Sequence, residues 1–371
     1  MSLVNILMII AVFLLYNLLL FYIGWNIRVW LRNTFGFKKK WPILLAMLFL
    51  GYSFVFGRFT GEVEIINIIG SYWMGVIQYS LLLFPIANLV VFVVKKFTSL
   101  SKHSIVTWAG YTLLICFVGI FAYGTYNAFT PVVRSYDIKV DKQVKGTDDL
   151  RVVMASDMHF GIMSGKGHAK RMVKEIKQLD PDMVLYVGDI IDDDPTPFID
   201  KKIDNDLAQI KAPLGTFAVL GNHEYYGGKI PEFVEKLEDI DIHVLRDEVA
   251  ELDNGITLIG RKDKTDTERK PVKELVDNVN QNNALFMLDH QPYELRKAEN
   301  NGIDLVVSGH THRGQLAPNH LITKFIYEND WGYLQKEDMH SIVSSGFGFW
   351  GPPLRLGSQA EIVEINIKFS N

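Results

Sequence analysis

Residues 151–159 read RVVMASDMH and residues 182–189 read DMVLYVGD, and in both a short apolar run ends in side chains that can bind a metal. Three later stretches repeat the pattern: TFAVLGNH at 216–223, ALFMLDH at 284–290 and DLVVSGHTH at 304–312. Short apolar runs bounded by Gly, Asp or Asn are typical of strands buried on both faces. Ligands of open α/β sheets bind outside the carboxyl ends of the strands. Five such ends in succession predict a binuclear metal centre.

Two of these ends carry a pair of candidate ligands two residues apart, Asp157 with His159 and His310 with His312. Side chains of an extended backbone alternate in direction with period two. We therefore expect both members of each pair to point the same way and to hold one ion. A lone Asp-x-His is common by chance, but its position at the end of a buried strand favours metal binding.

The other three ends supply the rest of the expected centre. Asp189 is the natural bridging carboxylate, because its two oxygens can bind cations about 3.5–4 Å apart. Asn222 offers a neutral oxygen and His290 an imidazole, whereas His223 is expected to stay off the metals and to act as a proton donor. Imidazole and carboxylate together suit Zn, Fe or Mn better than Ca or Mg. We therefore expect two divalent metal ions, of Zn, Fe or Mn, as cofactors.

Residues beside these motifs are candidate substrate contacts. Arg313, next to the last histidine pair, suits a phosphate oxygen, and Asp192, just after the expected bridging carboxylate, can steady the loop or a ligand. Asp193 and Asp194 are interpreted instead as solvated acids that precede a helix. His168, in SGKGH, is close enough in sequence to reach the same cleft.

Helical patterns separate the apolar runs, at residues 166–179, 196–210, 230–239 and 271–281. The alternation of strands with helices indicates βαβ units around a sheet. Before the first run, residues 134–150 form a polar connection in which we expect one short strand at 135–140.

The N-terminal third is predicted to be a membrane domain. Four segments lack Asp, Glu, Lys and Arg, at residues 1–27, 41–57, 65–94 and 103–133. Three exceed the ~20 residues needed to cross hydrocarbon, and the second, at 17 residues, is at the lower limit. We therefore expect about four transmembrane helices in a multi-pass protein of the cell membrane, with the lipid bilayer as a partner.

The charges predict an orientation. Residues 1–133 contain nine Lys and Arg against two Asp and Glu, a balance of +7, and the remaining residues contain 29 against 40, a balance of −11. Basic residues concentrate in the first and third loops, at 28–40 and 95–102, and such loops stay in the cytoplasm. The acidic domain is then extracytoplasmic, although basic residues just after the fourth segment oppose this orientation. The balance of −11 also argues against extended nucleic-acid binding.

The motifs SDMHFG, GDIID, GNHE, DHQP and SGHTHRGQ, in this order, resemble those of the calcineurin-like metallophosphoesterase superfamily. The closing SSGFGFWGPPLRLGSQAEIVEI resembles the tail of its bacterial membrane-associated branch. The resemblance covers about residues 150–367 and implies a four-layer α/β/β/α sandwich. The expected organisation is an α-helical transmembrane domain at 1–133, a connection at 134–150 and a metallophosphoesterase domain at 151–371.

The resemblance also implies two ligand sets that share one carboxylate. One metal would be held by Asp157, His159, Asp189 and His312. The other would be held by Asp189, Asn222, His290 and His310. His223 matches the catalytic histidine of the family, and every ligand position is present.

The expected function is that of a membrane-anchored phosphoesterase, which hydrolyses a phosphate mono- or diester by attack of a metal-bridging hydroxide. Its substrate would be a phosphorylated small molecule or lipid of the extracytoplasmic envelope. A nuclease or cyclic-nucleotide phosphodiesterase and a non-catalytic membrane sensor are the alternatives. Residues 317–340, with Trp331 and Tyr333, are a candidate substrate-facing loop.

Overall fold

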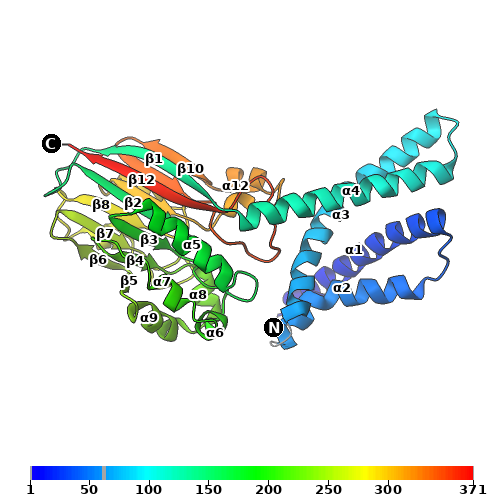
Figure 1. The fold of residues 1–371 in the computed structure, drawn as a ribbon, viewed down its shortest axis with the longest axis horizontal. Helices are drawn as coiled ribbons and strands as arrows, with labels where there is room; N and C mark the ends of the chain where they lie inside the picture. The colour runs from blue at the N-terminus through cyan, green and yellow to red at the C-terminus, as the bar shows by residue number, and fades with distance from the viewer. Residues whose placement is uncertain (1, 61–63, 371) are drawn as a thin grey trace. The chain divides into compact units, whose positions relative to one another are not determined.

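The computed structural model describes residues 2–60 and 64–370 (Figure 1). The chain divides into two compact units, Met1–Tyr123 and Gly124–Asn371. The last residues of the fourth helix thus group with the β-rich unit that follows. The boundary expected at residue 133 stays a prediction of where the membrane domain ends.

Helices make up the described part of the first unit. They are α1 (Leu3–Phe35), α2 (Trp41–Thr60), α3 (Glu64–Phe97) and most of α4 (Lys102–Phe129). By length and composition, α1, α3 and α4 can cross a membrane, whereas the apolar part of α2, Trp41–Gly57, is shorter. Three described helices therefore meet the criterion for a membrane span, and the fourth span expected at 41–57 stays a prediction.

Small residues let these helices pack closely. A Cβ at Gly70 of α3 would collide with the backbone of Phe54 in α2, so the two helices approach at backbone distance, as membrane helices do through small side chains. Leu20, Ile23 and Trp73 form part of the apolar core of this unit.

Two six-stranded sheets form the centre of the second unit. The first has the order β1-β12-β2-β3-β4-β5, and the second has the order β10-β11-β9-β8-β7-β6. The strands of the first sheet are β1 (Val132–Val140), β2 (Asp149–Ala155), β3 (Met183–Val187), β4 (Thr216–Val219), β5 (Ile242–Val244) and β12 (Glu361–Phe369). Those of the second are β6 (Glu248–Glu251), β7 (Ile256–Gly260), β8 (Ala284–Leu288), β9 (Leu305–Ser308), β10 (Gly332–Lys336) and β11 (Met339–Val343).

The apolar runs are continuous because the strands that carry them, β2, β3, β4, β8 and β9, each contribute side chains to two cores. In β2, Val152 and Met154 enter the core between the two sheets, whereas Val153 and Ala155 enter the core under the helices. Side chains alternate along a strand, so the part of β2 that is covered on both faces, residues 152–155, is apolar throughout.

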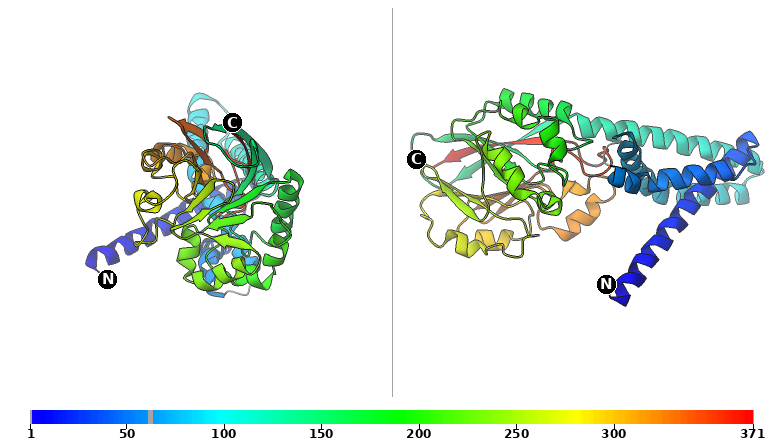
Figure 2. Two further views of the ribbon diagram at one scale, coloured as in Figure 1. Left: turned by 90° about the vertical axis from the view of Figure 1, so that its left-hand side faces the viewer. Right: turned by 90° about the horizontal axis from the view of Figure 1, so that it is seen from below.

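Helices cover the outer face of each sheet. On the first sheet lie α5 (Lys166–Leu179), α6 (Thr196–Asp200), α7 (Asp204–Leu207) and α9 (Ile230–Glu238). On the second lie α10 (Val272–Val276) and α11 (Leu295–Glu299). The left-hand view of Figure 2 shows the green helices and the yellow-to-orange helices on opposite sides of the strands. The four-layer α/β/β/α fold is therefore confirmed.

The strand expected at 135–140 is longer than predicted, and it pairs the beginning of the second unit with its last strand. β1 starts at Val132 and pairs in parallel with β12 along its full length, from Val132 opposite Glu361 to Val140 opposite Phe369. Only Thr130 and Pro131 separate α4 from β1.

Candidate metal centre

The candidate ligands follow the carboxyl ends of neighbouring parallel strands. β2, β3 and β4 are adjacent in the first sheet, and β8 and β9 are adjacent in the second. The side chains that follow them come together in space in clusters that can hold a metal. Asp157, His159, Asp189, Asn222 and His290 are all buried. The fold therefore brings the candidate ligands together at the carboxyl ends of these strands, as predicted.

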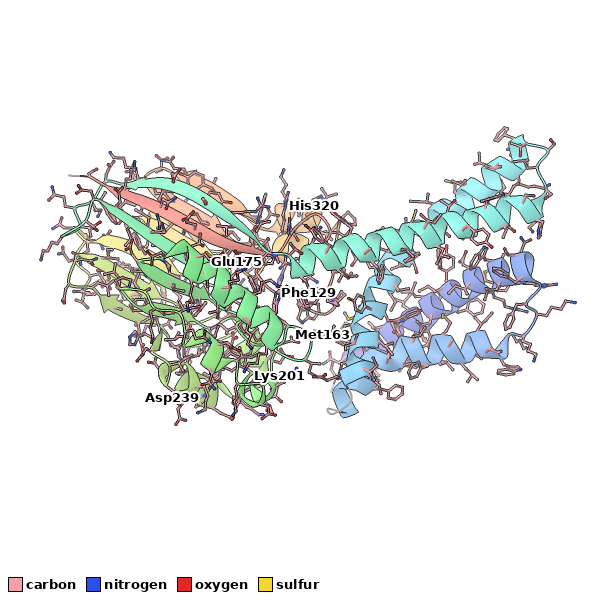
Figure 3. All side chains as sticks on the ribbon, in the orientation of Figure 1. Phe129, Met163, Glu175, Lys201, Asp239 and His320 are labelled. Atoms are coloured by element: carbon pink, nitrogen blue, oxygen red, sulfur yellow. The ribbon has the colours of Figure 1, made fainter. Side chains whose placement is uncertain are left out.

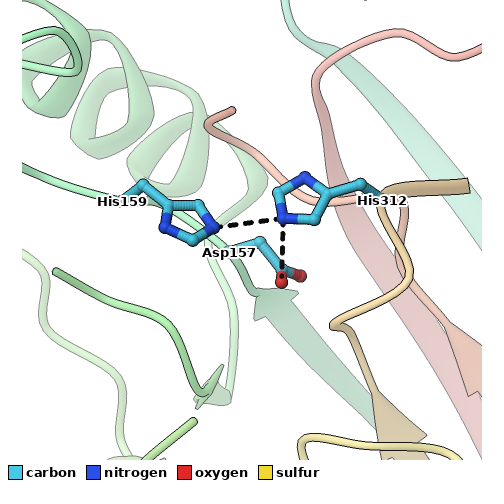
Figure 4. A group of neighbouring side chains, drawn as sticks. All are labelled: Asp157, His159 and His312. Carbon is cyan, nitrogen blue, oxygen red and sulfur yellow. Dashed lines mark hydrogen bonds and ion pairs between the residues drawn. The ribbon is translucent and has the colours of Figure 1, made fainter. Parts of the chain in front are cut away.

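One cluster consists of Asp157, His159 and His312 (Figure 4). His159 Nε2 lies 3.1 Å from His312 Nε2, which in turn lies 3.4 Å from Asp157 Oδ1. The backbone N–H of His310 donates to Asp157 Oδ1 at 2.9 Å and orients this carboxylate.

A second cluster consists of Asp189, His290 and His310. Asp189 Oδ2 lies 3.0 Å from His290 Nε2 and 3.9 Å from His159 Nε2, so one oxygen is close to a histidine of each cluster. The other oxygen, Oδ1, accepts the backbone N–H of His223 at 2.9 Å. Asp189 thus lies between these two clusters, and a third group of possible ligands, His159, Asp192 and His223, shares His159 with the first.

The backbone of the ligand loops differs from the expectation. Asp157, His159, Asp189, His310 and His312 have φ angles of 52°, 45°, 50°, 68° and 47°. These are left-handed conformations rather than extended ones, and such strain in non-glycine residues concentrates at functional sites. Asp157 and His159 do lie in one cluster, as predicted. The reason given for it was wrong, because their backbone is not extended. The expectation itself was wrong for His310 and His312, which lie in different clusters.

Two glycines allow the loops to approach one another. A Cβ at Gly221 would collide with Asp189 Oδ1, and one at Gly188 would collide with the ring of His290. Gly188 also has a φ of 79°, which favours glycine.

We expect Gly221→Ala to disrupt the centre. The φ of Gly221 is −105°, which any residue adopts, so the effect would come from the methyl group pushing the Asp189 carboxylate aside. Bound metal per chain should fall and hydrolysis should be lost. Gly167→Ala is the control, because among the described residues no atom lies within 4 Å of a Cβ at that position. Equal metal content in the two variants would contradict this account.

The donor atoms fit divalent cations. Among the described residues, Asn222 Oδ1 and His159 Nδ1 are buried without a hydrogen-bond partner, a costly state unless something else binds them. Burial lowers the pKa of His159 to about 3 and that of His310 to about 4. Both rings are therefore neutral at pH 7 and offer a lone pair to a metal.

The side chain of His223 is hydrogen-bonded to Asp193, a carboxylate that was expected to be solvated. Its Nδ1 donates to Asp193 Oδ1 at 2.7 Å. Although burial disfavours the charged ring, this hydrogen bond and the charges of Asp189, Asp192 and Asp193 raise the pKa of His223 to about 9. The expectation that Asp193 is a solvated acid was therefore wrong. Asp192 is nearby, with Oδ1 at 3.7 Å from His223 Nδ1 and a side chain that is 42% exposed.

Two further buried residues hold the ligand loops. Glu224 accepts the backbone N–H groups of Asp189, Ile191 and Gly221 and so joins the loops after β3 and β4. Arg355 Nη2 lies 3.2 Å from His312 Nδ1. Glu224 stands three residues after the helix N-cap, which is the spacing of a capping box, so its role had a signal in the sequence.

The remaining candidates lie in different surroundings. The guanidinium of Arg313 stacks over Trp331 at 3.8 Å from the ring centroid. Tyr333 stacks on Tyr136 and hydrogen-bonds His340, so its hydroxyl serves that contact. His168 packs against Phe347 and contacts the backbone oxygen of that residue. It does not belong to any of the described metal-binding clusters, and the expectation that it reaches the cleft is not supported.

Comparison with known proteins agrees with this geometry. Residues 150–314 match the family model described as calcineurin-like phosphoesterase. A metallophosphoesterase of Aquifex aeolicus is 33% identical over 258 residues, which cover 67% of this chain and 95% of the relative. The chain belongs to the calcineurin-like metallophosphoesterase family. A second metallophosphoesterase, from Helicobacter pylori, is 33% identical over 260 residues, which cover 68% of each chain.

A metallophosphoesterase that carries transmembrane segments is also related. The Danio rerio transmembrane protein with metallophosphoesterase domain is 30% identical over 263 residues, which cover 66% of this chain and 60% of that protein. This metallophosphoesterase is thus a metal-dependent phosphoester hydrolase with candidate metal-ligand clusters and helices that can span a membrane.

Proposed function

We propose that the protein is a membrane-anchored phosphoesterase with a binuclear metal centre, and that it hydrolyses a phosphate mono- or diester. The observation that carries the proposal is the position of Asp189, one oxygen of which is near a histidine of each cluster. Asp157, His159 and His312 would hold one ion with Asp189, and Asn222, His290 and His310 would hold the other. Bound Mn, Zn or Fe would supply a water of lowered pKa and neutralise charge on the phosphoryl oxygens.

The protein's own residues would position the reactants and move the proton. Asp193 holds Nδ1 of His223, so the ring keeps a fixed orientation and its Nε2 can give a proton to the leaving oxygen. Glu224 keeps the loops of Asp189 and Asn222 in place through buried hydrogen bonds. The proposed substrate contacts are Asp192, which lies near His223, and Arg313, which directly follows His312 in the sequence.

We further propose that the catalytic unit lies outside the cytoplasm and acts on an envelope or lipid-linked phosphate. The basic loops of the N-terminal part support this orientation. Limited proteolysis of intact cells, compared with inverted vesicles, tests it. Cleavage of the catalytic unit only in inverted vesicles would overturn the orientation and leave the reaction unaffected.

Metal-dependent turnover is the direct test of the reaction. The purified full chain, treated with a chelator and reloaded with Mn²⁺, should hydrolyse bis-p-nitrophenyl phosphate or p-nitrophenyl phosphate only after reloading. About two ions per chain are expected by elemental analysis. A protein that binds metal but turns over neither ester would favour the sensor alternative. Comparison of the two esters separates a diesterase from a monoesterase.

A further inference from the structure

Helix α12 (His320–Ile326) presents a solvent-exposed apolar face at the end of the catalytic unit. Leu321, Ile322, Phe325 and Ile326 are all exposed, and Phe325 is 91% exposed. These positions recur one turn apart and lie on one side of the helix. A contiguous exposed apolar patch of this kind marks an interaction site.

The opposite side of α12 is attached to the protein. Thr323 Oγ1 donates to Asp330 Oδ2 at 2.7 Å, and Asp330 also accepts a hydrogen bond from Thr311 through its backbone oxygen. A Cβ at Gly314 would collide with the start of the helix at Asn319 and His320. The helix is therefore held in place, with its apolar side turned outward.

α12 lies at the end of the unit where the chain arrives from the membrane helix. The backbone N–H of Ala317 donates to Leu356, and that of Arg355 donates to Gly124 in the last turns of α4. Residues 355–356 thus contact both α4 and the chain just before α12, and a Cβ at the next residue, Gly357, would lie 3.4 Å from the ring of His320 in α12. Figure 3 labels His320 of α12 and Phe129 of α4 at the same end of the catalytic unit.

We propose that the apolar face of α12 inserts into the surface of the lipid bilayer that the N-terminal helices cross. With only two residues between α4 and β1, this end of the unit stays close to the membrane. Trp350 is also exposed, and it lies next to His223 with ring centroids 6.2 Å apart. Tryptophan is enriched at membrane interfaces, and the exposed Lys324 can reach headgroup phosphates.

Docking of α12 has a consequence for the substrate. α12 follows the 3₁₀ turn η1 (His312–Gly314) and packs against it. Insertion of the helix would therefore bring the candidate metal centre close to lipid headgroups. This step rests on the proposed function, whereas insertion itself does not.

Site-directed spin labelling of the full chain in phosphatidylethanolamine–phosphatidylglycerol vesicles tests the insertion without reference to turnover. Cys116 is replaced by serine, and a single label is placed through Phe325→Cys or, independently, Ile322→Cys. Val249→Cys is the matched control, because Val249 is exposed on β6, at the opposite edge of the second sheet from β10. Relaxation by oxygen, which concentrates in hydrocarbon, is compared with relaxation by a water-soluble nickel chelate.

Labels at positions 322 and 325 should respond strongly to oxygen and weakly to nickel, and the label at 249 should do the reverse. A strong nickel response at both α12 positions would show that the face is in water and would overturn the proposal. A weak response to both reagents would show that protein covers it, either a second copy or another part of the chain, and would overturn it equally. Loss of turnover in any labelled chain bears only on the proposed function.

Discussion

Replacement of Asp189 by asparagine should abolish phosphoester hydrolysis. The substitution keeps the shape of the side chain but removes the negative charge that would be shared by two cations. It also replaces the oxygen pair that faces His290, His159 and the backbone of His223 by one oxygen and one NH2 group, which can only donate. We expect turnover of bis-p-nitrophenyl phosphate to fall below detection and metal content to fall with it.

The control for this variant is Asp253→Asn, which removes an exposed carboxylate from the turn between β6 and β7. It should keep wild-type turnover and metal content. Wild-type hydrolysis by the purified Asp189→Asn protein would rule out a shared carboxylate at the reaction centre.

Replacement of His223 by asparagine should separate catalysis from metal binding. His223 lies near His159 and Asp192 in a third group that could hold a metal, but its Nδ1 is hydrogen-bonded to Asp193, and we expect the metal content to stay at the wild-type level. Loss of a proton donor costs about 10²- to 10⁴-fold in rate. The loss should be larger for an alkyl phosphate than for a p-nitrophenyl ester, because p-nitrophenolate leaves readily without a proton.

His243→Asn is the matched control for this experiment. His243 pairs with Glu238 at the surface, and its side chain is 59% exposed, so its loss should change neither rate nor metal content. An equal loss of rate with both leaving groups in the His223 variant would show that this histidine positions the substrate instead of protonating the leaving oxygen.

The strand ends could be predicted from the sequence because their signal is local. A buried parallel strand must be apolar throughout, so a polar residue directly after it is conspicuous, as at Asp157 and Asp189. The backbone conformation of these residues could not be predicted. Left-handed φ angles at Asp157 and His310 depend on contacts between loops that are far apart in the chain.

The residues that hydrogen-bond to the histidines of the site could hardly be predicted from the sequence. Asp193 stands in an acidic run whose composition is that of a surface turn, and only the folded chain shows its hydrogen bond to His223. Arg355 follows His312 at a distance of 43 residues, so no spacing rule connects the two. Exposure of the apolar face of α12 also depends on the tertiary fold, because a seven-residue helix is too short for a clear periodic pattern.

The pairing of β1 with β12 imposes an order on biosynthesis. β1 is made soon after α4, but the strand beside it is β12 (Glu361–Phe369), which is made only after all the other strands of the first sheet and which also separates β1 from β2. The first sheet therefore cannot be completed until β12 has been synthesised and has left the ribosome. Until then β1 has no strand to pair with, so folding of the nascent catalytic unit depends on a strand that is made much later in the sequence.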